Sequence, residues 1–158
     1  MQPRHIELLQ RMPIFGAIRE DTLRVLLAQA HEIEVPAGAW LCREHEPARS
    51  MFVLESGLAS VLKQWQGFEF LLHQLHAGDC VGEMALMDLQ ARSASVRAET
   101  DCLAIELSSD DLMRLYEQDL EQFALIQMNM GREVCRRLRV TDEMLFRYRM
   151  GEGPSPQG

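Results

Sequence analysis

The chain has 158 residues, a length that suits one well-packed domain and is short for two. Apolar residues make up 47% of the chain and charged residues 25%, which excludes a disordered or fibrous protein. The formal net charge is −8, and residues 1–131 carry 10 basic against 20 acidic side chains. Such a surface repels nucleic-acid phosphates, so we do not expect the main body of the protein to bind DNA.

The sequence has no apolar run of membrane-spanning length and no apolar stretch typical of a signal peptide near its start. We therefore expect a cytoplasmic protein that does not contact a membrane. The four cysteines, Cys42, Cys80, Cys102 and Cys135, are widely separated and lack the spacing of a metal or redox motif. This spacing predicts four small buried residues and no metal or other cofactor.

The first 30 residues predict two short helices. Apolar residues recur at helical spacing from Ile6 to Met12, and Pro13 ends that pattern. A second helical pattern covers Leu23 to Ala30 and has Asp21 as its candidate N-cap.

From His31 onward the chain predicts many short strands separated by turns. The strand patterns are rich in apolar residues, and glycine, proline or acidic residues interrupt them. The predicted strands cover residues 31–35, 40–42, 51–54, 58–62, 68–75, 93–98 and 102–107. Short strands at this spacing favour a β-sandwich or β-barrel.

The helical period returns after residue 107. Ser108 or Ser109 can cap a short helix, and a long helix follows from about Leu120 to about Met150. Residues 151–158 are rich in glycine and proline and predict a disordered tail. We thus expect a single domain over residues 1–150, with N-terminal helices at 1–30, strands at 31–107 and C-terminal helices at 108–150.

The long helix carries an apolar seam of about two heptads, which we interpret as the contact of a homodimer formed by residues 134–148. Its members are spaced four, three, four and three residues apart: Val134, Leu138, Thr141, Leu145 and Tyr148. The alternative is a helix that packs along the β-structure of its own chain.

One segment, residues 78–96, combines features that suit an anion. Gly82 permits close backbone approach at the start of a helical turn, where amide groups lack intrahelical partners. Arg92 offers parallel donors for two phosphate oxygens, and Ser93 adds a hydroxyl. Glu83 can accept hydrogen bonds from a hydroxyl of the same ligand. A ribose joined to a phosphate meets these demands.

Residues 82–86, followed by Arg92, Ser93 and Ala94, resemble the phosphate-binding cassette of cyclic nucleotide-binding domains, such as those of the bacterial cyclic-AMP receptor family and protein kinase A regulatory subunits. Residues 13–15, 36–38 and 51–57 resemble other parts of this family, and the likeness covers about residues 10–148. It implies a mainly β fold with flanking helices, namely a β-roll or jelly roll with the cassette at residues 82–95.

The resemblance also implies roles for individual cassette residues. Arg92 would pair with the exocyclic phosphate oxygens, and Ser93 would donate to the phosphate. Gly82 and the backbone around Met84 and Ala85 would supply further ligand contacts.

Glu83 would hold the ribose 2′-hydroxyl, as the same resemblance implies, and Arg137 on the long helix would face it. Thr141 resembles the threonine that contacts the adenine amino group, which favours cyclic AMP over cyclic GMP as the ligand. Asp142 is the last of the expected ligand-binding residues. It stands where the family often has a serine that makes a contact across the dimer, so this chain departs from the family there.

These features predict a regulatory module that couples nucleotide binding to the position of the long helix and to dimer geometry. About ten residues follow the long helix, too few for the helix-turn-helix module of related transcription regulators. We therefore expect the signal to pass to a protein partner.

Two other hypotheses remain at this stage. One is a domain that dimerises as a scaffold without binding a ligand. The other is a cupin-type metalloenzyme with His73, His76 and Glu83 as ligands, although residues three apart on a strand point to opposite faces. We find no constellation typical of a catalytic site in the sequence and do not expect an enzyme.

Overall fold

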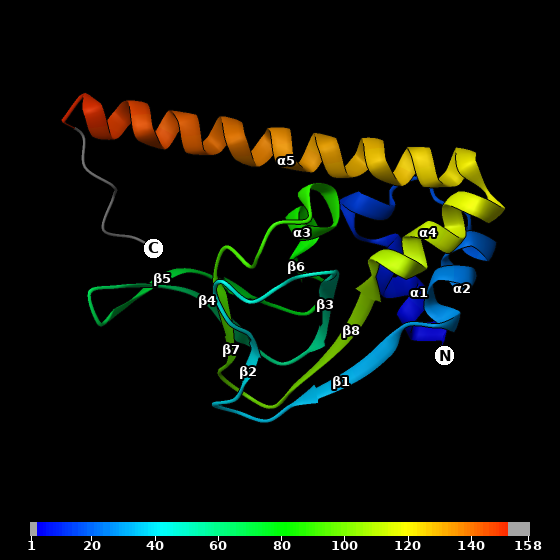
Figure 1. Ribbon diagram of the computed structural model, residues 1–158, viewed down its shortest axis with the longest axis horizontal. Helices are drawn as coiled ribbons and strands as arrows, with labels where there is room; N and C mark the ends of the chain where they lie inside the picture. Colours follow the sequence, from blue (N-terminus) through cyan, green and yellow to red (C-terminus); the bar gives the residue numbers. More distant parts are fainter. Residues whose placement is uncertain (1–2, 152–158) are drawn as a thin grey trace.

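The alternating segments of the sequence form two antiparallel four-stranded sheets in the computed structural model, which describes residues 3–151. The two sheets face each other and enclose part of the core, as a β-roll does (Figure 1). The strands are β1 (His31–Val35), β2 (Trp40–Cys42), β3 (Ser50–Ser56), β4 (Ala59–Trp65), β5 (Phe68–Leu75), β6 (Cys80–Val81), β7 (Ser95–Ala98) and β8 (Cys102–Ser108).

The strand order is β1-β8-β3-β6 in one sheet and β2-β7-β4-β5 in the other. In the first sheet Val53 lies opposite Ile105, and in the second Val61 lies opposite Val96. Residues opposite each other on neighbouring strands point to the same face of the sheet, and all four side chains are buried in the apolar interior. The mainly β fold with flanking helices that we expected is confirmed.

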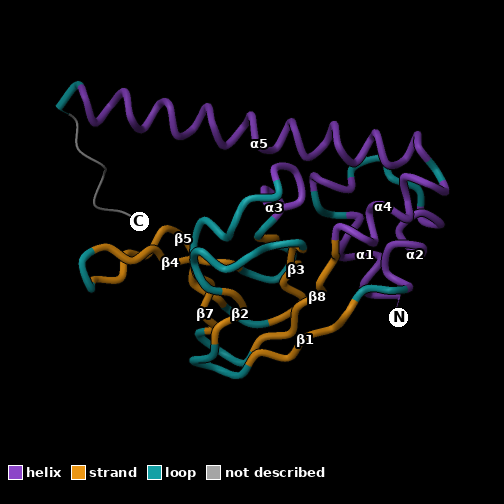
Figure 2. Tube along the Cα trace, in the orientation of Figure 1, coloured by secondary structure: helices purple, strands orange, loops and turns teal. Residues whose placement is uncertain are grey.

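Most of the helices gather at one end of the β-roll, and one long helix runs across it (Figure 2). They are α1 (Pro3–Gln10), the 3₁₀ turn η1 (Pro13–Phe15), α2 (Glu20–Ala28), α3 (Glu83–Asp88), α4 (Ser109–Gln118) and α5 (Leu120–Arg149). Ser108 caps α4: its Oγ accepts from the Asp111 amide at 3.1 Å, and the Asp111 carboxylate accepts from the Ser108 amide at 2.8 Å.

The interior consists of two apolar clusters. One lies between the terminal helices and the sheet that contains β3 and β8, and the early part of α5 packs into it through Ile126 and Met130. The other lies between the two sheets. Helix α5 is thus anchored at its start, whereas its side chains from Cys135 onward are exposed.

Several details differ from the sequence prediction. Helix α2 begins at Glu20, one residue before Asp21, whose carboxylate accepts from the amide of the adjacent Thr22 at 2.9 Å. The first helix ends at Gln10, two residues before Met12, which is nevertheless buried. Residues 152–158 of the predicted disordered tail lie outside the described residues.

The prediction of four buried cysteines is wrong in part. Cys42 and Cys102 are buried and Cys80 is half-buried, but Cys135 is exposed on α5. The reason is that α5 has passed the core by this point, which an isolated cysteine in a sequence does not reveal.

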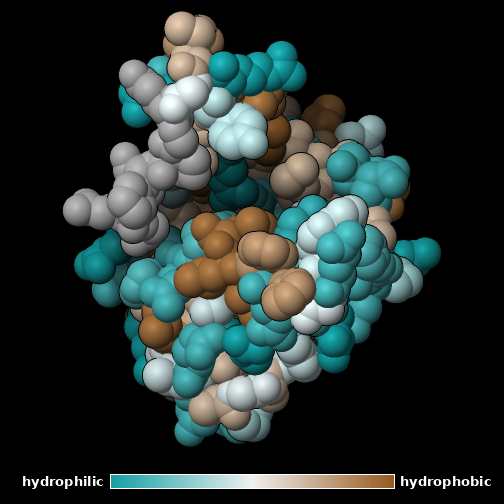
Figure 3. Space-filling model, turned by 90° about the vertical axis from the view of Figure 1, so that its left-hand side faces the viewer, coloured by the Kyte–Doolittle hydropathy of each residue, from teal (hydrophilic) through white to brown (hydrophobic). Residues whose placement is uncertain are grey.

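The end of the molecule where α5 finishes carries exposed apolar side chains. The hairpin of β4 and β5 exposes Trp65 and Phe68, which are 67% and 68% accessible, and Phe70, Leu71 and Leu72 follow on β5. Figure 3 views this end, and apolar surface gathers on it. Within residues 3–151, no helix combines the length and apolar character that crossing a bilayer requires.

Candidate functional site

The centre of the site is the buried guanidinium of Arg92, which follows the cassette helix α3 and is only 8% accessible. Its Nη1 donates to the Ser50 carbonyl at 2.7 Å, and its Nη2 donates to the Ser50 hydroxyl at 3.2 Å. The guanidinium also lies 5.0 Å from the centre of the Phe52 ring. Strand β3 therefore holds the cation in one place.

Arg92 forms no ion pair within the part of the chain that the structure describes. Arg92 is linked indirectly to a carboxylate, because the Ser50 hydroxyl that accepts from Arg92 donates to Glu106 at 2.7 Å. A buried cation without an adjacent anion is unfavourable. Since a guanidinium has five N–H donors and two are used by Ser50, the remaining donors suit an anionic ligand.

Gly82 makes room for this guanidinium. It lies directly before α3 with φ of +87°, a left-handed conformation that favours glycine. A Cβ atom at this position would lie 2.2 Å from Arg92 Nη1 and 3.1 Å from the Ser50 carbonyl oxygen. The glycine that the sequence singled out is thus required by both backbone geometry and close approach.

A cavity of about 220 Å³ opens beside Arg92. Most of the predicted site residues line it: Gly82, Glu83, Met84, Ala85, Arg92, Ser93 and Arg137. The Ser93 side chain is exposed, and its hydroxyl forms no hydrogen bond with residues 3–151, so it is available to a ligand.

Glu83, the first residue of α3, is 2% accessible, and its carboxylate is paired with the guanidinium of Arg137 from α5. The Arg137 side chain is 43% accessible and also lies 3.8 Å from Glu133. This contact confirms that the two side chains face each other, as the resemblance implied. The carboxylate that we expect to accept from a ribose hydroxyl is therefore in contact with the long helix.

Four further titratable groups line the cavity: Cys42, His73, Cys80 and Asp88. The Cys80 thiol lies 4.0 Å from Glu83, and burial raises its pKa to about 11, although the charge of Arg137 opposes that shift. Burial and, secondarily, Arg137 lower the pKa of His73. The cavity therefore holds a protonated thiol and a neutral imidazole at pH 7, so Arg92 and Arg137 are its cationic groups.

Thr141 lines a second, larger cavity of about 730 Å³ beneath α5. His73, Cys80 and Arg137 line both cavities, so the two lie next to each other. The Thr141 hydroxyl donates to the Arg137 carbonyl at 3.0 Å within the helix. Asp142 is exposed and lines neither cavity. The structure thus places Thr141 beside the cassette cavity and leaves Asp142 outside it.

The sequence did not identify Ser50 and Phe52 as part of the site. They precede Arg92 by about 40 residues, and only the fold of β3 against the cassette brings them together. No local motif signals them.

The cupin hypothesis fails on geometry. His76 lies beyond the end of β5, 3.9 Å from Asp79, and Glu83 is engaged by Arg137. Across residues 3–151, His73, His76 and Glu83 do not bring their ligand atoms together as a metal requires.

Comparison with known proteins places this geometry in a family. The family model described as the cyclic nucleotide-binding domain matches residues 32–119 of this chain. These residues include both sheets of the β-roll and the whole cassette. The chain belongs to the cyclic nucleotide-binding domain family. It is therefore a regulatory domain of a non-catalytic sensor family, as the cassette residues indicated.

Two curated relatives illustrate the likeness of this cyclic nucleotide-binding domain. It is 32% identical over 126 residues to the cAMP-activated global transcriptional regulator CRP of Salmonella typhimurium. This alignment covers 78% of this chain and 58% of the relative. It is 31% identical over 107 residues to the cAMP-dependent protein kinase regulatory subunit of Emericella nidulans. This alignment covers 68% of this chain and 26% of the relative. The chain thus spans less than two thirds of either relative.

Among solved structures, the catabolite activator protein of Thermus thermophilus superposes with a TM-score of 0.75 at 25% identity. The superposition covers 84% of this chain and 61% of that one. The shared part supports the same β-roll with N-terminal helices and a long C-terminal helix.

Proposed function

We propose that this domain senses cyclic AMP, which binds in the cassette cavity and repositions helix α5. The observation that carries the proposal is Arg92, a buried guanidinium that has unused donors and no carboxylate within ion-pairing distance in residues 3–151. The cyclic phosphate supplies the single negative charge that this site accommodates.

The other contacts follow from the placement of the cassette. With the phosphate on Arg92 and Ser93, the ribose 2′-hydroxyl donates to Glu83, and the base extends toward the cavity that Thr141 lines. Thr141 then meets the amino group of adenine, which favours cyclic AMP over cyclic GMP. The names of the two curated relatives, cAMP-activated and cAMP-dependent, agree with this preference.

Coupling to α5 arises at Glu83. Arg137 and the ribose hydroxyl use the same carboxylate, so the free energy of nucleotide binding depends on where α5 lies. Residues 134–148 of α5 provide the homodimer contact in this proposal, and Leu138 and Leu145 are 57% and 49% accessible. A change in α5 position then changes dimer geometry, which a cytoplasmic protein partner detects.

Calorimetric titration of the chain with cyclic AMP and with cyclic GMP tests the proposal. We expect one nucleotide per chain and tighter binding of cyclic AMP. If neither nucleotide binds below about 1 mM while analytical ultracentrifugation shows a folded dimer, the scaffold hypothesis replaces this one.

A further inference from the structure

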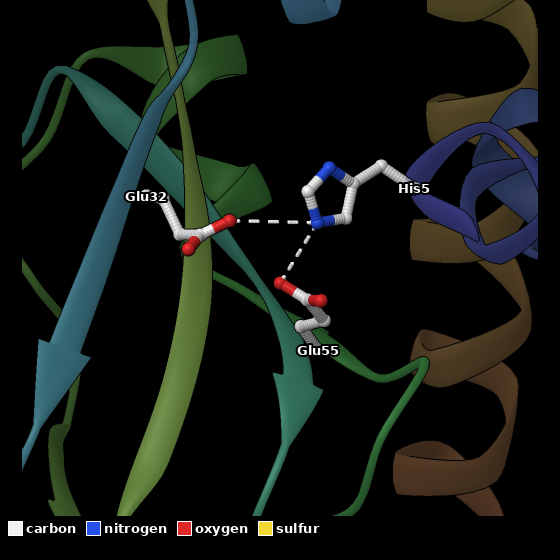
Figure 4. A group of neighbouring side chains, drawn as sticks. All are labelled: His5, Glu32 and Glu55. Carbon is white, nitrogen blue, oxygen red and sulfur yellow. Dashed lines mark ion pairs between the residues drawn. The ribbon is translucent and has the colours of Figure 1, made fainter. Parts of the chain in front are cut away.

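A second cluster of chemically active side chains lies away from the cassette, where α1 meets the sheet containing β1 and β3. Figure 4 shows His5 from α1, Glu32 from β1 and Glu55 from β3 pointing toward one another. His5 Nε2 lies 3.0 Å from Glu55 Oε2 and 3.4 Å from Glu32 Oε2. His5 is 2% accessible, and the Glu55 side chain is 8% accessible.

The spacing of these three atoms suits a tetrahedral metal ion. Zinc binds imidazole nitrogen and carboxylate oxygen at about 2.0–2.2 Å, which places neighbouring tetrahedral ligands about 3.3–3.6 Å apart. The two distances from His5 Nε2 are close to that spacing, and all three ligand atoms lie within 4.8 Å of one another. An ion at their centre also removes the repulsion between the carboxylates of Glu32 and Glu55.

The surroundings of the cluster support ligation. Arg4 Nη2 contacts the other oxygen of Glu55, Oε1, at 2.9 Å, which leaves Oε2 directed at His5. Orientation of a ligand by a neighbouring group is typical of metal sites. The Glu32 side chain is 46% accessible, so an ion can enter from that side and keep a water molecule as its fourth ligand.

We propose that His5, Glu32 and Glu55 bind one divalent transition-metal ion of the zinc type. One nitrogen and two oxygen donors suit this class, whereas magnesium prefers six oxygen ligands. The ion joins α1 to β1 and β3, so it fastens the N-terminal helix to the β-roll. The proposal is independent of the nucleotide site, because none of the three residues lines the cassette cavity.

Titration of the EDTA-treated full chain with zinc chloride tests this proposal. Glu32→Gln removes one ligand from a partly exposed position, so the variant is expected to fold. Glu34→Gln is the matched control, because Glu34 is an exposed glutamate of the same strand outside the cluster. We expect one zinc per chain, an unchanged zinc affinity in Glu34→Gln, and an affinity at least about tenfold weaker in Glu32→Gln.

Two further measurements sharpen the outcome. Zinc should raise the thermal unfolding midpoint of the wild type and Glu34→Gln more than that of Glu32→Gln. X-ray absorption at the zinc edge should show only nitrogen and oxygen ligands. Equal zinc affinity in the two variants, a sulfur ligand, or no zinc binding by the wild type overturns the proposal and leaves the cluster as an ion-paired histidine.

Discussion

The guanidinium of Arg137 lies against the carboxylate of Glu83, although the two residues are 54 positions apart in the sequence. The contact joins the long helix to the first residue of the cassette helix. Because Glu83 is 2% accessible, its carboxylate has little contact with solvent, and the Arg137 guanidinium supplies the opposite charge beside it. A ligand hydroxyl that binds Glu83 therefore acts directly on α5.

Replacing Arg137 tests this link in the absence of nucleotide. Arg137→Ala leaves a buried carboxylate without its cation, so we expect the free energy of unfolding to fall by about 1–3 kcal/mol. Arg139→Ala is the control, since Arg139 lies exposed on the same helix and forms no ion pair with residues 3–151. Urea unfolding at pH 7 measures both variants, and equal losses would contradict a specific role for the Glu83 contact.

Replacing Arg92 tests the phosphate contact. We expect Arg92→Gln to weaken cyclic AMP binding by about 100-fold, on the order of 3 kcal/mol, because the charge-assisted hydrogen bonds to the phosphate are lost. Arg24→Gln removes an exposed arginine that pairs with Glu20 on α2, and it should bind cyclic AMP normally. Calorimetry gives both affinities. Unaltered affinity in Arg92→Gln would remove the basis of the proposed function.

Gly82→Ala separates backbone conformation from close approach. The left-handed φ is expected to lower stability by about 1–2 kcal/mol, and the added Cβ should also displace Arg92 and weaken cyclic AMP binding at least tenfold, by about 1.4 kcal/mol. Gly38→Ala is the control. It introduces the same conformational strain at φ of +85°, but the added Cβ would have no atom of a non-adjacent residue within 4 Å.

Thermal unfolding should show that both variants lose similar stability through backbone strain. Calorimetry should show weaker cyclic AMP binding only in Gly82→Ala. Similar nucleotide affinities in the two variants would mean that the space beside Gly82 is unimportant.

The Cys80 thiol provides a pH-dependent probe of the cavity. Its pKa is raised to about 11 from 9.0, chiefly by burial, so at pH 8 only about one thiol in a thousand is ionised. Alkylation of Cys80 by iodoacetamide should therefore be slow and rise about tenfold per pH unit up to about pH 11. The exposed Cys135 should react first.

Peptide mass mapping between pH 7 and pH 10 measures both cysteines in one sample. Bound cyclic AMP should slow Cys80 further without affecting Cys135, and equal rates at pH 8 would contradict the burial of Cys80. The raised pKa also affects stability, because the folded state holds this proton more tightly. That contribution is present below pH 9 and is lost as the pH rises toward 11.

The proposed dimer contact predicts a difference between adjacent residues. Leu145 belongs to the apolar seam, whereas Phe146 lies about 100° further around the helix and is also exposed, at 57%. Leu145→Glu should weaken dimerisation at least tenfold, by about 1.4 kcal/mol, because it buries a charge in the contact. Phe146→Glu should leave the strength of dimerisation unchanged. Sedimentation equilibrium measures the dimerisation of both variants. If Leu145→Glu dimerises as strongly as the wild type, residues 134–148 are not the interface.

Much of the site was predictable because its signals are local. Four of the predicted site residues occur within 12 positions of the sequence: Gly82, Glu83, Arg92 and Ser93. Glycine and arginine are residue types that suit phosphate binding. Ser50, which holds Arg92, was not predictable, since nothing in its own neighbourhood in the sequence distinguishes it from other strand residues.

Seven of the eight strands, the turns and the long helix could be predicted from the sequence, because apolar periodicity and turn residues act over a few positions, whereas the two-residue strand β6 was not predicted. The burial of Arg92 without an ion pair among residues 3–151, and the meeting of His5 with Glu32 and Glu55, become visible in the folded chain alone. The same is true of the exposure of Cys135. These properties depend on which distant segments pack together, and that packing is set by the whole core rather than by any local pattern.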